Sequence, residues 1–250
     1  MTPDSFSDGG RWLDPDAAVA RGLAMVAEGA DVVDVGGEST RPGADPVAED
    51  EERRRVLPVV AALAPHVRVS IDTRRAAVAE QAVAAGATLV NDVSASLWPV
   101  AAAAGPGVGW VAMHMRGEPR TMQQAPVYDD VVAEVRAFLV ERASTARDAG
   151  VEEVWIDPGI GFGKTVAHNL ALLRATRSLA ATGWPVLVGA SRKTFLGLVT
   201  AEGGVPTTAD DRLEASLAAA VWTLEQGASM VRVHDVRPTV QAVRLLVAAS

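Results

Sequence analysis

Seven short valine-rich segments alternate with longer alanine-rich segments along this chain, and this alternation is what most limits the folds that it can adopt. The short segments are Asp31–Gly37, Val67–Thr73, Thr88–Ser94, Gly109–Met115, Val154–Gly159, Pro185–Ser191 and Met230–Val236. Near-continuous runs of β-branched residues are typical of strands that are buried on both faces, as in a parallel sheet. The order of strand and then helix predicts an α/β fold with parallel strands.

The longer segments have the apolar spacing of amphipathic helices. They are Asp16–Glu28, Glu49–Leu63, Arg75–Ala85, Tyr128–Ala149, Asn169–Ala181, Ala209–Gln226 and Pro238–Ala248. Three of the helical segments are followed by Gly-Ala just before a strand, at Gly29, Gly86 and Gly227. Glycine suits the left-handed residue that commonly ends a helix. We therefore predict a repeated unit of strand and helix with tight turns between them.

The length of 250 residues is typical of one (β/α)8 barrel, the TIM barrel. No linker or shift in composition divides the chain, so we predict a single domain over residues 1–250. A closed barrel of this type needs eight strands, whereas seven are predicted here. Because the chain opens on the loop-like segment Thr2–Gly10, we expect the first strand to be missing from this chain. An open sheet is the alternative.

Composition excludes several classes of function. The formal net charge of −8 argues against a nucleic-acid surface. The absence of cysteine excludes disulfides, thiolate zinc sites and cysteine nucleophiles. No apolar run has the length of a membrane span, and the first residues do not read as a signal segment. We therefore expect a cytoplasmic protein with neither nucleic acid nor a membrane as a partner.

Polar side chains gather near the end of almost every predicted strand. They are Asp34 and Glu38, Asp72, Asn91 and Asp92, His114, Asp157, Ser191 to Lys193, and Arg232 with His234. Active sites of α/β barrels are built at this end of the strands. Because buried polar groups are unfavourable unless they are paired, the whole set indicates a binding site. Helix capping and loop bridging stay the alternative for any single member.

Arg232 and His234 are two residues apart in a predicted strand, so we expect their side chains on the same face. A guanidinium group matches phosphate oxygens and an imidazole adds a donor, which predicts an anion site. An ion pair between Arg232 and a carboxylate is the alternative. We expect His66 and His168 to be structural, with His168 at or before the start of a helix.

The segment Asp157–Thr165 (DPGIGFGKT) is not a nucleotide P-loop, because Pro158 stands where that motif needs glycine. Its glycines are expected to let the loop turn tightly over the barrel mouth. Asp157 can accept two parallel N–H bonds from an amidine-like ligand edge. Asn91 can both donate and accept a hydrogen bond, and Lys193 supplies a mobile cation.

Eight tracts together resemble the dihydropteroate synthase family, in its order and spacing over the whole chain. They are Thr2–Gly10 (TPDSFSDGG), Asp34–Ala44 (DVGGESTRPGA), Ser70–Arg75 (SIDTRR), Asn91–Ser94 (NDVS), Met113–Gln123 (MHMRGEPRTMQ), Asp157–Lys164 (DPGIGFGK), Gly189–Lys193 (GASRK) and Arg232–Val236 (RVHDV). The resemblance implies a transferase of folate biosynthesis, in a TIM barrel, that joins a pterin methyl diphosphate to 4-aminobenzoate. Pyrophosphate and 7,8-dihydropteroate would be the products. It also implies Mg²⁺ as cofactor, a homodimer, and sulfonamide binding at the aminobenzoate site.

The resemblance further implies roles for individual residues. The pterin is expected at Asp72, Asn91, Asp157 and Lys193, and the diphosphate with Mg²⁺ at Arg232 and His234. The aminobenzoate site is expected to comprise Ser5, Phe6, Thr40, Arg41, Pro42, Phe162, Ser191 and Arg192. The expected catalytic residues are Asp72, Lys193, Arg232 and His234. No metal ligand is identified within the chain, because the asparagine that family members use near the ion would precede Met1.

Two alternatives stay open beside the synthase. One is a pterin-dependent methyltransferase domain of the same fold class. The groups Ser191 to Lys193 and Arg232 with His234 argue against it, because a methylated folate carries no diphosphate. The other is a binding-only or inactive truncated paralogue, which would bind pterin without turnover. One departure from the family pattern is Ala95-Ser96, where paired glycines are frequent.

Overall fold

The structure is a computed structural model in which residues 14–39 and 46–249 are described. Several expectations therefore lie outside the described residues. They are a strand preceding Met1 and the aminobenzoate roles of Ser5, Phe6, Thr40, Arg41 and Pro42.

Every predicted strand segment contains one observed strand. The strands are β1 (Val32–Gly36), β2 (Arg68–Asp72), β3 (Leu89–Asp92), β4 (Gly109–Met113), β5 (Val154–Asp157), β6 (Leu187–Val188) and β7 (Met230–Val231). The first five pair in parallel in chain order, and β6 pairs in parallel with β7. A bridge between Ile156 and Val186 joins the two groups. The predicted parallel α/β order is therefore confirmed.

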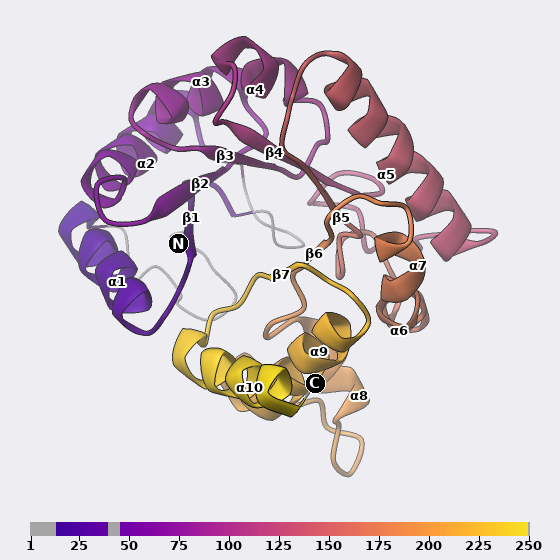
Figure 1. Cartoon of the computed structure of the whole chain (residues 1–250). Helices are drawn as coiled ribbons and strands as arrows, with labels where there is room; N and C mark the ends of the chain where they lie inside the picture. Colours follow the sequence, from indigo (N-terminus) through magenta and orange to yellow (C-terminus); the bar gives the residue numbers. More distant parts are fainter. Residues whose placement is uncertain (1–13, 40–45, 250) are drawn as a thin grey trace.

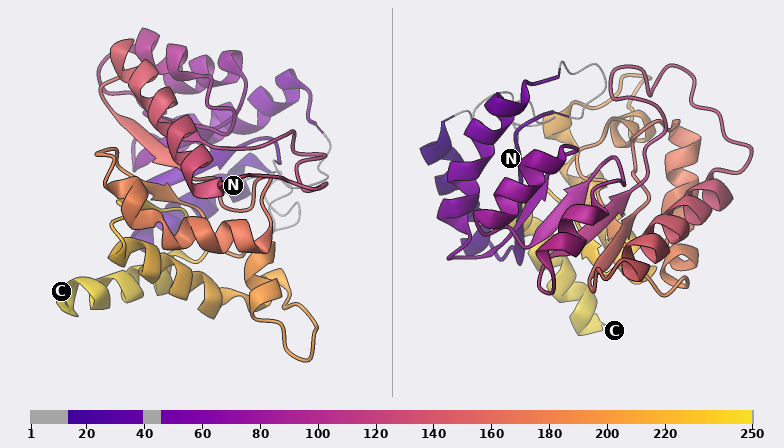
Figure 2. Two further views of the ribbon diagram at one scale, coloured as in Figure 1. Left: turned by 90° about the vertical axis from the view of Figure 1, so that its right-hand side faces the viewer. Right: turned by 90° about the horizontal axis from the view of Figure 1, so that it is seen from above.

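The helices surround the strands (Figure 1) and run alongside them in the side view (Figure 2). They are α1 (Pro15–Ala27), α2 (Glu49–Leu63), α3 (Ala76–Ala84), α4 (Trp98–Ala104), α5 (Val131–Asp148), α6 (Val166–Arg174), α7 (Thr176–Ala180), α8 (Thr194–Val199), α9 (Leu213–Glu225) and α10 (Val236–Ala249). This is the arrangement of a (β/α)8 barrel, as predicted, rather than an open sheet with helices on both faces. Within the described ranges, no helix is long and apolar enough to cross a bilayer.

Local capping explains several helix limits. The side chain of Asp130 accepts hydrogen bonds from the amides of Val132 and Ala133, which begins α5 three residues later than predicted. Thr165 and His168 form a reciprocal capping box at α6, which confirms the structural role expected for His168. The segment predicted as one helix over Asn169–Ala181 is divided at Ala175 into α6 and α7.

Two apolar clusters hold the barrel. The larger one lies between the sheet and its helices and includes Val69, Ile71, Trp110 and Ile156. The smaller one comprises Leu89, Val111 and Leu187, with Val32, Trp155 and Met230 packed against it. Its members come from six of the seven described strands, as expected for side chains that fill a barrel interior. This packing brings the carboxyl ends of the strands to one end of the barrel.

Candidate active site at the carboxyl ends of the strands

Three strand ends meet at the guanidinium group of Arg232. Its Nε donates to Asp34 Oδ2 at 2.6 Å and its Nη2 donates to Asp72 Oδ2 at 2.8 Å. Asn91 Nδ2 donates to the same Asp34 oxygen at 3.1 Å. The barrel therefore gathers Asp34, Asp72, Asn91 and Arg232, as the strand-end pattern predicted. Of the two interpretations of Arg232, the ion pair with a carboxylate is the one observed.

The two carboxylates that share Arg232 have different pKa values. Burial raises the pKa of Asp72 to about 7. The charge of Arg232 opposes this rise, whereas the charge of neighbouring Asp34 adds to it. Burial also acts on Asp34, but the charge of Arg232 brings the pKa of Asp34 below its usual value. One arginine thus serves two buried acids, of which Asp34 is the firmly ionised one.

Arg232 and His234 follow β7 rather than lying within it. The prediction that both belong to the strand is wrong, because β7 ends at Val231 and the chain turns toward α10, which begins at Val236. His234 Nδ1 lies 3.0 Å from Ser191 Oγ, and the His234 amide donates to the same oxygen at 3.2 Å. The structure therefore pairs His234 with Ser191, a predicted aminobenzoate residue.

Arg192 and Lys193 point to different neighbours. Arg192 donates through Nε and Nη2 to the two carboxylate oxygens of Asp235, at 2.8 and 2.6 Å. Lys193 Nζ donates to the Ile160 carbonyl at 2.6 Å and lies 4.0 Å from the centre of the Phe162 ring. Phe162 and Lys193, predicted for the aminobenzoate and pterin sites respectively, therefore lie in direct contact.

Asp157 is buried at the end of β5. Its Oδ1 accepts the Gly159 amide at 2.7 Å. Burial raises the pKa of Asp157, although the Gly159 hydrogen bond and the charge of Lys193 oppose the rise. Burial likewise lowers the pKa of Lys193 to about 7, while Asp157 acts in the opposite direction. Such perturbed groups close together are typical of functional sites.

The loop after Asp157 depends on glycine. Gly159 and Gly163 have φ angles of 63° and 62°, in the left-handed region. A Cβ atom on Gly159 would lie 1.9 Å from the His114 carbonyl oxygen, and one on Gly163 would lie 2.2 Å from that of Arg116. The predicted tight turn of this loop is therefore confirmed, and the loop lies directly against the segment that follows β4.

Asp92 is the member of the strand-end set for which the capping alternative holds. Its carboxylate accepts the amides of Ser94, Ser96 and Leu97 at 2.6 to 2.9 Å, and the Trp110 indole N–H at 3.1 Å. These bonds hold a turn in which Ala95 has a φ of 51°. Glycine adopts this conformation without strain, so the turn would favour glycine over alanine at position 95.

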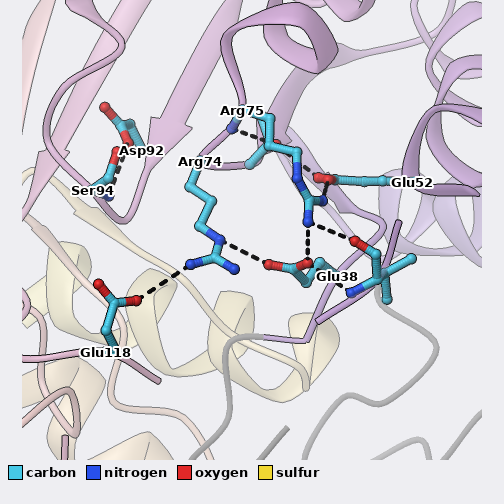
Figure 3. A network of polar contacts seen from close by, with 9 residues as sticks. Glu38, Glu52, Arg74, Arg75, Asp92, Ser94 and Glu118 are labelled. Carbon is cyan, nitrogen blue, oxygen red and sulfur yellow. Dashed lines mark hydrogen bonds and ion pairs between the residues drawn. The ribbon is translucent and has the colours of Figure 1, made fainter. Parts of the chain in front are cut away.

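Figure 3 shows a network of charged side chains around Glu38, a member of the predicted strand-end set whose partners the sequence did not predict. Glu38, after β1, accepts Arg74 Nε at 2.9 Å and Arg75 Nη2 at 2.8 Å. It also accepts the Val47 amide at 2.9 Å, and Arg75 Nη2 donates to the Val47 carbonyl at 2.6 Å. Hydrogen bonds from Arg74 and Arg75 therefore connect Glu38 and Val47 to the start of α3.

The second anchor of this network is Glu52 on α2, which is 1% exposed. It pairs with Arg75 and accepts the Thr73 hydroxyl at 2.7 Å. A sequence signal for it exists, since Glu52 lies four residues before Val56 on the buried stripe of α2. A charge on an apolar stripe indicates a buried partner.

Replacement of Glu52 by alanine is expected to destabilise the protein by about 3 kcal/mol, because it removes the buried carboxylate to which Arg75 Nη1 and the Thr73 hydroxyl donate. Chemical denaturation measures this loss. The matched control is Glu51→Ala, which removes ion pairs with Arg54 and Arg55 at the surface and is expected to cost much less stability. Equal losses in the two variants would contradict the assigned anchoring role.

Over residues 14–39 and 46–249, no three histidine or acidic side chains form a group that could hold a metal ion. The described part of the site thus offers carboxylates, one amide, an imidazole and three cationic side chains, but no group of three acidic or histidine ligands. An ion that arrives on a phosphate-bearing ligand needs few protein ligands.

Comparisons with known proteins agree with this geometry. The family model described as "Pterin binding enzyme" matches residues 1–234. The dihydropteroate synthase of Mycobacterium leprae is 50% identical over 98% of this chain and 89% of its own length. That of Escherichia coli K12 is 44% identical over 98% of this chain and 88% of its own length.

Solved structures are similar over almost the whole chain. The Yersinia pestis dihydropteroate synthase with a sulfonamide drug complex has a TM-score of 0.92 and 41% identity, covering 99% of this chain and 90% of its own. The Thermus thermophilus enzyme in complex with 4-aminobenzoate has a TM-score of 0.88 and 45% identity, covering 100% of this chain and 91% of its own. The Xanthomonas albilineans enzyme with 7,8-dihydropteroate has a TM-score of 0.85 and 42% identity, covering 99% and 89%.

Proposed function

Because this chain belongs to the dihydropteroate synthases of the pterin binding enzyme family, we propose that its converging strand ends form one active site for a pterin diphosphate and 4-aminobenzoate. The chain is a transferase of folate biosynthesis that condenses (7,8-dihydropterin-6-yl)methyl diphosphate with 4-aminobenzoate. The observation that carries the residue assignment is the meeting of Asp72, Asn91 and Arg232, with Asp157 and Lys193 close by.

The pterin ring is assigned to Asp157, Asn91 and Lys193. A buried carboxylate suits the amidine-like edge of a pterin, because it can accept two parallel N–H bonds. Asn91 is oriented by its bond to Asp34, and Lys193 is oriented by Ile160 and Phe162. Three polar groups held by other contacts can recognise a flat heterocycle with little loss of side-chain entropy.

The diphosphate is assigned to Arg232 and His234. A diphosphate has to compete with Asp34 and Asp72 for the Arg232 guanidinium, and its higher charge density favours that exchange. We propose that Mg²⁺ is held mainly by the phosphates, which agrees with the small number of protein donors. When bound, the ion neutralises charge on the departing diphosphate.

The reaction breaks the bond between the pterin methylene carbon and the diphosphate oxygen, and the bonding electrons leave with pyrophosphate. The pterin-stabilised cation that remains is then attacked by the arylamine nitrogen, which forms the new C–N bond and loses one proton to solvent. Carboxylates of Asp72 and Asp157 stabilise the positive charge. No strong base is needed, since an arylamine is already a neutral nucleophile.

The aminobenzoate site is assigned to Phe162, Ser191 and Arg192 among the described residues. Phe162 offers an aromatic face beside Lys193, and Ser191 lies against His234. The remaining assigned residues lie outside the described ranges, namely Ser5, Phe6, Thr40, Arg41 and Pro42.

Turnover tests the assignment directly. The protein is mixed with the pterin diphosphate, Mg²⁺ and labelled 4-aminobenzoate, and labelled dihydropteroate is expected. Removal of Mg²⁺ with a chelator is expected to lower the rate at least about tenfold, because charge on the leaving group is no longer neutralised. Pterin binding without product would instead favour the binding-only paralogue.

We also propose a homodimer. Apolar side chains are exposed on two helices of the C-terminal half, with Leu198 and Val199 on α8 at 47% and 52% exposure and Trp222 on α9 at 49%. Exposed apolar groups of this size frequently mark protein interfaces. Sedimentation at micromolar concentration should give twice the chain mass of 26.0 kDa, and a monomer would overturn the proposal.

A further inference from the structure

Lys164 is a buried cation with no part in the assignments above. It is 3% exposed, and its Nζ contacts three acceptors. They are the Phe162 carbonyl at 3.0 Å, the His114 carbonyl at 3.2 Å and His114 Nδ1 at 3.0 Å. An ammonium group has three N–H donors and no acceptor, so the three contacts match its donors in number.

Lys164 belongs to a set of groups that fix the loop Gly159–Gly163. Every carbonyl of this loop accepts a hydrogen bond. In chain order the donors are the Phe162 amide, Lys193 Nζ, Gln123 Nε2, Lys164 Nζ and the Tyr128 hydroxyl. Lys164 is the donor that holds the backbone of Phe162 itself, and it links that backbone to the end of β4.

His114 provides two of the three acceptors of Lys164. Its Nδ1 has to accept from Lys164, which places the ring proton of the neutral imidazole on Nε2. The ring is 6% exposed and stands edge-on to Phe138, with centroids 5.1 Å apart. Burial lowers the pKa of His114 to about 3, and the charges of Lys164 and Arg116 add to this effect. His114 is therefore neutral at physiological pH.

We propose that Lys164, which donates a hydrogen bond to neutral His114, is a positioning residue. It sets the place of the Phe162 ring and so the affinity for 4-aminobenzoate. This inference rests on the proposed function, in which Phe162 forms part of the aminobenzoate site. The pterin groups depend less on Lys164: Asn91 is held by Asp34 and Lys193 by the Ile160 carbonyl, and the charge of Lys164 affects the pKa of Asp157 less than the Gly159 hydrogen bond and the charge of Lys193 do. Loss of Lys164 therefore affects one substrate more than the other.

The first test is Lys164→Met, which keeps an unbranched side chain out to Cε and removes the ammonium group with its donors. The KM for 4-aminobenzoate is expected to rise about tenfold or more, since the hydrogen bond from Lys164 to the Phe162 carbonyl and its two links to His114 are lost. The Kd of the pterin diphosphate, measured by calorimetry, is expected to change less than about threefold. Equal losses for both substrates, or a change in thermal stability alone, would overturn the proposal.

A matched pair at His114 separates positioning from general packing. In His114→Asn the amide oxygen takes nearly the place of Nδ1 and still accepts from Lys164, whereas His114→Leu offers no acceptor. We expect a KM for 4-aminobenzoate within about threefold of wild type in the asparagine variant and about tenfold higher in the leucine variant. If both variants behave alike, the acceptor role of His114 is wrong, even where Lys164→Met does not fold.

Failure of this inference is distinguishable from failure of the proposed function. A wild-type chain that makes no dihydropteroate would contradict the function itself. A wild-type chain with normal turnover, beside variants with unchanged KM for 4-aminobenzoate, would contradict only the role of Lys164 and His114.

Discussion

Replacement of Arg232 by alanine is expected to weaken binding of the pterin diphosphate by about 100-fold or more, because two charge-assisted hydrogen bonds to phosphate oxygens are lost. Binding of the bare pterin, which carries no phosphate, is expected to fall much less. Calorimetry with the two ligands measures the difference. Equal losses for both ligands would contradict the assignment of Arg232 to the diphosphate.

Arg68 provides the control for this variant. It pairs with Glu153 near the opposite ends of the strands, at the start of β2. Arg68→Ala removes a partly exposed ion pair, so it is expected to leave the affinity for the diphosphate unchanged within about twofold.

The same Arg232→Ala variant is expected to lose stability in a pH-dependent way. It leaves Asp34 and Asp72 buried together without their cation, which costs about 3 kcal/mol near neutral pH. Without that cation, the folded-state pKa of Asp72 lies further above its unfolded value and the pKa of Asp34 rises from its lowered value, so the folded state binds more protons than the unfolded state. Stability of the variant should therefore rise as the pH falls from 8 toward 5, as measured by denaturation at each pH.

Replacement of Gly159 by alanine is expected to abolish measurable turnover and to destabilise the fold by about 4 kcal/mol or more. The added Cβ would lie 1.9 Å from the His114 carbonyl oxygen, which is backbone and cannot move aside without shifting the end of β4. The shift would also displace the amide that holds Asp157. Turnover and denaturant unfolding together measure the effect.

Gly203 is the control that separates backbone strain from steric conflict. Its φ of 57° is close to the 63° of Gly159, but a Cβ there meets nothing within 4 Å. Gly203→Ala should therefore cost about 1 kcal/mol and leave turnover intact. A similar loss in both variants would mean that strain, and not contact with His114, explains the need for glycine at position 159.

The strands were predictable because their signals are local. Each strand lies in a short valine-rich run, and at three of them a helix-ending glycine stands just before that run. Two helices were not predicted. The seven residues of α4 are too few and too uniformly apolar to show a helical period. The six residues of α8 include Gly197, and that helix packs against Arg212, where a Cβ on Gly197 would lie 2.5 Å from Nε. Tertiary contact, not local propensity, specifies α8.

The composition of the site was predictable, but its pairing was not. Polar residues at strand ends marked where the site would be, since barrel topology brings those ends together. The partners of Arg232 lie 160 and 198 residues away in sequence, so no local pattern identifies Asp34 and Asp72 as the pair that shares it. The turn at Val231 likewise depends on how β7 meets α10. Arg75 and Glu52 were missed for the same reason.

The glycine loop between Asp157 and Lys164 also bears on the design of inhibitors. Since each of its carbonyls from Gly159 to Gly163 already accepts a donor from the protein, a compound that extends an N–H or O–H toward this loop would have to share an acceptor in use. The loop offers a medicinal chemist a fixed shape and the face of Phe162 instead. Analogues should therefore improve here through the fit of an aromatic ring rather than through added hydrogen-bond donors.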